Sequence, residues 1–114
     1  MGNTRRAYAL DHILSTLPAL RRMLVIIRRH DRNLEEQMRR AATSVALNLG
    51  EADGQEAGHR QSRLRTALGE LRELRTGLKV AVAFGYVSEA ATTDIDRRLD
   101  QAAAMTWRRL NPLP

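Results

Sequence analysis

The chain has 114 residues, enough for one domain with a hydrophobic core, and 43% of them are hydrophobic although only 4% are aromatic. Three prolines and seven glycines provide little turn chemistry for a sheet protein, and the absence of cysteine excludes disulfides and thiolate metal sites. The formal net charge is +6, and Lys79 is the one lysine among the 19 basic residues.

The basic residues are clustered along the chain. Residues 1–40 carry nine arginines and four acids, residues 41–58 carry three acids and no base, and residues 59–79 carry six bases and two acids. A genome rich in G and C explains a preference for arginine but not its clustering. A planar guanidinium binds phosphate or carboxylate through two parallel hydrogen bonds, so the clusters indicate an anionic partner.

The first expected helix runs from Ala9 to about His30, after a short lead-in at residues 1–8. Pro18 interrupts it, so either the helix kinks there or Thr16 caps a second helix. The apolar rhythm continues across the proline and favours one kinked helix. The amino terminus lacks the apolar core of a signal peptide, and no apolar run approaches the roughly 20 residues of a membrane helix. We therefore expect a cytoplasmic protein with no membrane partner.

We expect Asn33 to be the N-cap of the second helix, with Glu36 as its capping-box partner. The helix is expected to run to about Ala52. Asn48 falls within the apolar band of this helix, where a buried amide must find hydrogen-bond partners. The other residues of the band are Leu34, Met38, Ala41, Ala42, Val45, Leu49 and Ala52.

A polar segment, GEADGQEAGH, separates the second helix from a long third helix over residues 58–85. Its apolar seam recurs at spacings of three and four residues, at Leu64, Ala67, Leu71, Leu74, Leu78 and Ala81. Ser88 caps a fourth helix that runs to about Leu110, before Asn111 and Pro112. Four amphipathic helices joined by short links predict one all-α domain over residues 1–114, an antiparallel up-down four-helix bundle.

Nothing in the sequence indicates catalysis. The three histidines, His12, His30 and His59, lie on different elements without ligand spacing, and no nucleotide-binding or hydrolase motif occurs. Asp96 and Asp100 form only a like-charged pair four residues apart. We expect no enzyme activity, no catalytic residue, no metal and no cofactor.

The basic residues of the third helix form either a solvated face, as most such stripes do, or a surface that binds a partner. Arg65, Arg72 and Lys79 recur every seven residues on one face, and Arg60 and Arg63 crowd the amino-terminal turn, where the helix dipole disfavours cations. Such positions suggest an anionic ligand or the acidic groups of a neighbouring subunit. Glu51 and Glu73, each near arginines, are expected with Asn48 in a structural polar network.

Two segments, QMRRAATSVALNLGEA (37–52) and ALGELRELRTGLKVAVAFGYV (67–87), resemble a known family. They are similar to the small four-helix-bundle proteins encoded in intervening sequences of bacterial large-subunit ribosomal RNA genes, and to the related accessory protein of diversity-generating retroelements. The matching residues are Arg39, Arg40, Ser44, Asn48, Glu51, Ala67, Gly69, Leu71, Glu73, Leu74, Gly85 and Tyr86. The turn after Glu51 departs from the family pattern, because it is acidic where the family is basic or aromatic.

The resemblance implies a bundle that assembles into a closed ring, commonly a homopentamer, and in the retroelement branch a basic surface for nucleic acid and a reverse transcriptase. The leading hypothesis is therefore a non-enzymatic ring that binds RNA or DNA. The expected binding residues are Arg39, Arg40, Arg60, Arg63, Arg65, Arg72 and Lys79. The alternative is a homo-oligomeric scaffold for another protein, with its arginines in salt bridges between subunits. The physiological partner and the exact subunit number stay open.

Overall fold

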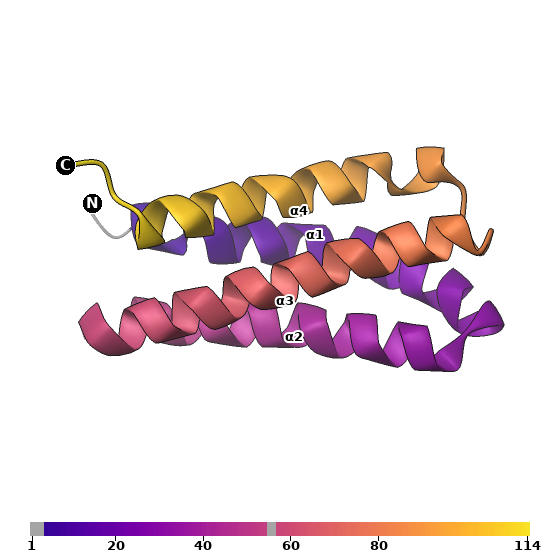
Figure 1. Ribbon diagram of the computed structural model, residues 1–114, viewed down its shortest axis with the longest axis horizontal. Coiled ribbons are helices and arrows are strands. Elements are labelled where there is room, and N and C mark those ends of the chain that lie inside the picture. The colour runs from indigo at the N-terminus through magenta and orange to yellow at the C-terminus, as the bar shows by residue number, and fades with distance from the viewer. Residues whose placement is uncertain (1–3, 55–56) are drawn as a thin grey trace.

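Four helices form an antiparallel bundle in the computed structural model, which describes residues 4–54 and 57–114 (Figure 1). They are α1 (Thr4–His30), α2 (Arg32–Asp53), α3 (Ala57–Ala83) and α4 (Glu89–Leu110). Each helix packs on the next along the chain, and α1 also packs on α4. The start of α1 and the end of α4 lie at one end of the bundle, and the α1–α2 and α3–α4 turns lie at the other. The expected all-α up-down four-helix bundle is confirmed.

Helix α1 is longer than the sequence suggested. It begins at Thr4, so the expected lead-in is wrong for residues 4–8, while residues 1–3 lie outside the described part. Pro18 lies inside one continuous helix, as expected. Thr16 is fully buried and its hydroxyl donates to the carbonyl of His12 at 2.8 Å, so it does not cap a second helix.

Helix α2 begins two residues before the expected start. Its N-cap is Asp31, whose carboxylate accepts a 2.9 Å hydrogen bond from the backbone N–H of Leu34; the expected N-cap, Asn33, is the second residue of the helix. The other carboxylate oxygen of Asp31 accepts from the Tyr86 hydroxyl at 3.2 Å. This long-range bond joins the two turns.

Helix α3 ends through a Schellman motif. Gly85 has φ +78°, and the N–H groups of Gly85 and Tyr86 bind the carbonyls of Val82 and Ala81, each at 2.9 Å. Ser88 then caps α4 by accepting from the N–H of Ala91 at 3.2 Å, as expected.

The core is the seam that the sequence indicated. All six seam residues of α3 are at most 2% exposed, and they face buried side chains of the other three helices. Gly77 allows a close contact between α2 and α3, since a Cβ atom there would be 2.6 Å from Cγ of Met38.

Candidate functional site

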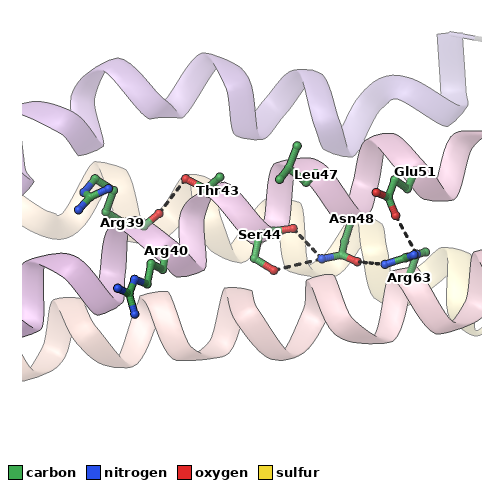
Figure 2. A pocket seen from close by; sticks show the side chains of 8 residues that line it. All are labelled: Arg39, Arg40, Thr43, Ser44, Leu47, Asn48, Glu51 and Arg63. Carbon is green, nitrogen blue, oxygen red and sulfur yellow. Dashed lines mark hydrogen bonds and ion pairs between the residues drawn. The ribbon is translucent and has the colours of Figure 1, made fainter.

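A groove of about 430 Å³ runs along the outside of α2 toward α3, and we name it the α2–α3 groove. Most of its residues come from α2, and Arg63 comes from α3 (Figure 2). Arg40, Ser44 and Glu51 share one face of α2 because helical neighbours are three or four residues apart. The lining residues are Arg39, Arg40, Thr43, Ser44, Leu47, Asn48, Glu51 and Arg63.

A polar network closes one end of this groove. Asn48 is only 8% exposed, and its amide nitrogen donates to the carbonyl and the hydroxyl of Ser44 at 2.8 and 3.1 Å. Its amide oxygen accepts from Arg63 at 3.4 Å, and Arg63 also pairs with Glu51 at 2.9 Å (Figure 2). The dipole argument had suggested an anionic ligand or another subunit for Arg63, but α2 of the same chain provides its carboxylate.

The expected network therefore contains Asn48 and Glu51 but not Glu73. It lies at the surface, because the side chains of Glu51 and Arg63 are each about half exposed. Glu73 lies on α3 beside Leu34 and Gln37 of α2, far along the helix from Arg63. Burial raises the pKa of the neighbouring Glu70, and the charge and hydrogen bond of Glu73 raise it further.

A buried carboxylate supports the other end of the groove. Glu35 is 4% exposed and binds Arg28 of α1 at 2.7 Å and Arg39 at 3.0 Å. Burial by itself raises the pKa of Glu35, but the hydrogen bonds from the two guanidinium groups outweigh it and hold the pKa below its usual value.

The burial of Glu35 is not among the expectations from the sequence. A signal was present, because Glu35 precedes Met38 by three residues and Ala42 by seven, on the buried face of the helix.

Positive charge exceeds negative charge in this region. The groove residues include three arginines and one glutamate, which leaves two positive charges. Including Arg28 and Glu35 behind the groove gives four cations and two carboxylates, again an excess of two. Arg40 is exposed and makes no ion pair with any residue of the described part. The groove thus presents an unneutralised guanidinium, with Arg39 and Arg63 as further donors.

The other expected binding residues do not join this groove. Arg65 and Arg72 are exposed on α3, and Arg65 makes only a 3.5 Å hydrogen bond to Gln61. Arg60 is half-buried near the start of α3 and has polar contacts of its own. Lys79 lines a separate groove between α3 and α4. The structure therefore gathers Arg39, Arg40 and Arg63 from the expected set and places the other four elsewhere.

That second groove, the α3–α4 groove, has a volume of about 650 Å³. Arg75 crosses it and binds Asp96 and Asp100 of α4, each at 2.9 Å. The hydrogen bond from Arg75 outweighs the effect of burial and holds the pKa of Asp96 below its usual value. Sequence reasoning had treated the two aspartates only as a like-charged pair, whereas Arg75 neutralises both. The remaining lining residues are Leu78, Lys79, Val82, Ala83, Glu89, Thr92, Thr93 and Arg97.

Neither a metal-binding cluster nor a membrane-spanning helix occurs among the described residues. Within residues 4–54 and 57–114, no three His, Asp or Glu side chains converge as a metal site would require. In the same part of the chain, no helix has a long enough apolar stretch to cross a membrane.

Comparison with known proteins agrees with the fold. The sequence profile of the 23S rRNA-intervening sequence protein family matches residues 23–108. A crystal structure from Bacteroides thetaiotaomicron, of a protein with unknown function from the S23 ribosomal protein family, superposes with a TM-score of 0.81. The two chains are 17% identical, and the superposition covers 90% of this chain and 98% of the other, which supports the fold alone. No curated protein matches the sequence.

Proposed function

The chain belongs to the 23S rRNA-intervening sequence protein family, and on that premise we propose that it is a non-enzymatic bundle whose α2–α3 groove binds the phosphate backbone of RNA or DNA. The observation that carries the proposal is the guanidinium of Arg40, which has no ion pair among the described residues, in a groove where arginines outnumber carboxylates. Arg39 and Arg63 each use part of their donor set on a carboxylate and keep about half of their side chains exposed.

The donors of the groove suit a backbone better than a base edge. Asn48 already binds Ser44 and Arg63, and the hydroxyl of Thr43 donates to the carbonyl of Arg39 at 3.0 Å. The groups that remain for a ligand are therefore mainly guanidinium N–H groups, which recognise phosphate oxygens and carry little sequence information. Binding in this groove is expected to depend weakly on sequence.

The family resemblance extends the proposal to an assembly. In a closed ring, commonly a pentamer, identical grooves repeat around one axis, and linked sites convert weak phosphate contacts into a strong overall affinity. A reverse transcriptase that acts on the same nucleic acid is the proposed protein partner.

A second candidate function is a scaffold that binds protein. Exposed apolar side chains favour it, since Leu47 is 62% exposed at the α2–α3 groove and Leu14 and Val25 of α1 are about half exposed. In that case Arg40 pairs with a carboxylate of another subunit or of a protein partner.

Binding of labelled RNA and DNA at increasing salt concentrations separates the two candidates. Three phosphate contacts predict that the logarithm of the association constant falls by about 2 to 3 for each tenfold increase in salt. Sedimentation velocity at the same salt concentrations measures the assembly. Absence of binding at low salt, together with an assembly that dissociates as salt rises, would reject the nucleic-acid proposal in favour of the scaffold.

A further inference from the structure

Three rings stack at the end of the bundle where both helical turns lie. The Tyr86 ring is nearly parallel to the His30 ring, with centroids 5.1 Å apart and an interplanar angle of 7°. It is also nearly parallel to the Phe84 ring, with centroids 5.3 Å apart and an angle of 14°. Tyr86 is held in place by its hydroxyl, which donates to Asp31, and by the Schellman hydrogen bond to Ala81. We name these three rings the aromatic ladder.

The two outer rings of the aromatic ladder are exposed to solvent. Phe84 follows the last residue of α3 and is 67% exposed, and His30 is also exposed, whereas Tyr86 is half-buried. Phe84 contributes little to the core, which closes at this end on Ala81 and the partly buried Tyr86 and Val87. A single exposed aromatic ring requires no explanation, but a preordered stack with one ring open to solvent offers a flat surface to another ring.

The charges around the ladder are suited to an anion. Arg29, at the end of α1, and Arg32, at the start of α2, are exposed and make no ion pair with any described residue. The neighbouring Arg28 is paired with Glu35, whereas Asp31 accepts hydrogen bonds from the uncharged N–H of Leu34 and hydroxyl of Tyr86 and keeps its charge. Arg29 and Arg32 together outweigh Asp31, so the α1–α2 turn beside the ladder carries one net positive charge.

We propose that the aromatic ladder is a stacking site for an unpaired base of single-stranded nucleic acid, with Phe84 against the base and Arg29 and Arg32 on the flanking phosphates. The proposal rests on the proposed function and deepens it by naming the class of nucleic acid. Proteins that bind single strands combine a basic surface with aromatic side chains on which bases stack, and every base has a face that stacks. A duplex keeps its bases stacked internally, so this site selects single strands with little regard for sequence.

The ladder also has a purely structural explanation, in which the rings only close the end of the core. That explanation applies to Tyr86, which is half-buried and bonded across the turns. It does not predict any effect of Phe84 on binding, because that side chain lies mostly in solvent.

The test uses two single strands of equal length, one of deoxyadenosine and one in which every base is replaced by an abasic site. We measure their affinities by fluorescence anisotropy for the intact chain and for Phe84→Ala, Phe84→Leu and Trp107→Ala. Trp107 is the matched control, since it is 52% exposed and lies in the last turn of α4, which ends at the opposite end of the bundle from the two turns (Figure 1). Thermal unfolding checks that each variant folds.

We expect Phe84→Ala and Phe84→Leu to weaken binding of the deoxyadenosine strand by about 5- to 100-fold, the range for loss of one stacked base, and to leave the abasic strand unaffected. Trp107→Ala is expected to bind both strands as the intact chain does. Equal affinity of the intact chain for the two strands, or unchanged binding by Phe84→Ala, would overturn the stacking site and leave the phosphate groove standing. Failure to bind either strand would overturn both proposals, whereas base-dependent binding that Arg40→Gln leaves unchanged would overturn only the groove.

Discussion

Helix α3 separates two grooves that use arginine in opposite ways. On its α4 side, the three cations Arg75, Lys79 and Arg97 face three carboxylates, those of Glu89, Asp96 and Asp100, so the lining charges cancel. On its α2 side, three arginines face one carboxylate and the charges do not cancel. The facing helix decides the difference, because α4 presents aspartates four residues apart where α2 presents serine, threonine and asparagine.

The arginines of the two grooves also differ in how deeply they are buried. The Arg75 side chain is 27% exposed and binds two aspartates, whereas the Arg63 side chain is 49% exposed and binds one glutamate. The first arrangement stabilises the α3–α4 contact. The second leaves guanidinium donors exposed to solvent. We therefore expect stability to depend on Arg75 and binding to depend on the arginines of the α2–α3 groove.

The largest effect on stability is expected from Arg75→Met. Removing the guanidinium leaves Asp96 and Asp100 close together without the cation that hydrogen-bonds to both, and we expect the free energy of unfolding at pH 7 to fall by about 2 kcal/mol. Because the folded pKa of Asp96 is lowered, its contribution is present above the ordinary carboxyl pKa and is lost as the pH falls through the lowered value. Denaturant titration at several pH values measures the difference between the intact chain and the variant.

The difference between Arg75→Met and the intact chain should therefore shrink toward zero in acid. Nucleic-acid binding by the folded variant is expected to be unchanged. A variant as stable as the intact chain at pH 7, or one that loses binding, would show that the two grooves are not specialised in this way.

A smaller effect is expected from two glycines of α3 that face different surroundings. Gly77→Ala places a Cβ atom 2.6 Å from Cγ of Met38, and the forced repacking is expected to reduce the free energy of unfolding by about 1 kcal/mol despite the better helix propensity of alanine. In Gly69→Ala the added Cβ atom has no neighbour within 4 Å, and the variant is expected to increase the free energy of unfolding by about 0.5 kcal/mol.

Chemical denaturation of both glycine variants gives the comparison directly. Both variants carry the same substitution in the same helix. Equal changes of the free energy of unfolding, in the same direction, would therefore contradict a close α2–α3 contact at Gly77.

Much of the fold can be predicted from the sequence, because apolar residues at helical spacing can be buried in only a few arrangements of the four helices. The seam of α3 and the cap at Ser88 are local patterns, and both are confirmed. The cap of α2 is Asp31 and not the expected Asn33, and the local pattern does not decide between them because both residue types are favoured N-caps. Asp31 also accepts from Tyr86, 55 residues away in sequence, a contact that local spacing does not show.

The candidate site follows from the sequence only in part. Arg40, Ser44 and Asn48 meet in one groove because four-residue spacing on one helix requires it. Lys79 shares a seven-residue repeat with Arg72, yet it lies in the α3–α4 groove near the carboxylate of Asp96, because the facing helix determines which cations meet an acid. The seven-residue repeat alone does not show which groove Lys79 joins, because that depends on the tertiary structure.

The most direct test of the α2–α3 groove compares RNA binding by Arg40→Gln and Lys79→Gln across salt concentrations. Both variants lose one positive charge, from an exposed position in one or the other groove. We expect Arg40→Gln to bind more weakly and to lower the salt slope by about 0.7 to 0.9, the value for one phosphate contact, while Lys79→Gln binds as the intact chain does. Equal losses in the two variants would contradict the account, because binding would then depend on net charge and not on the α2–α3 groove.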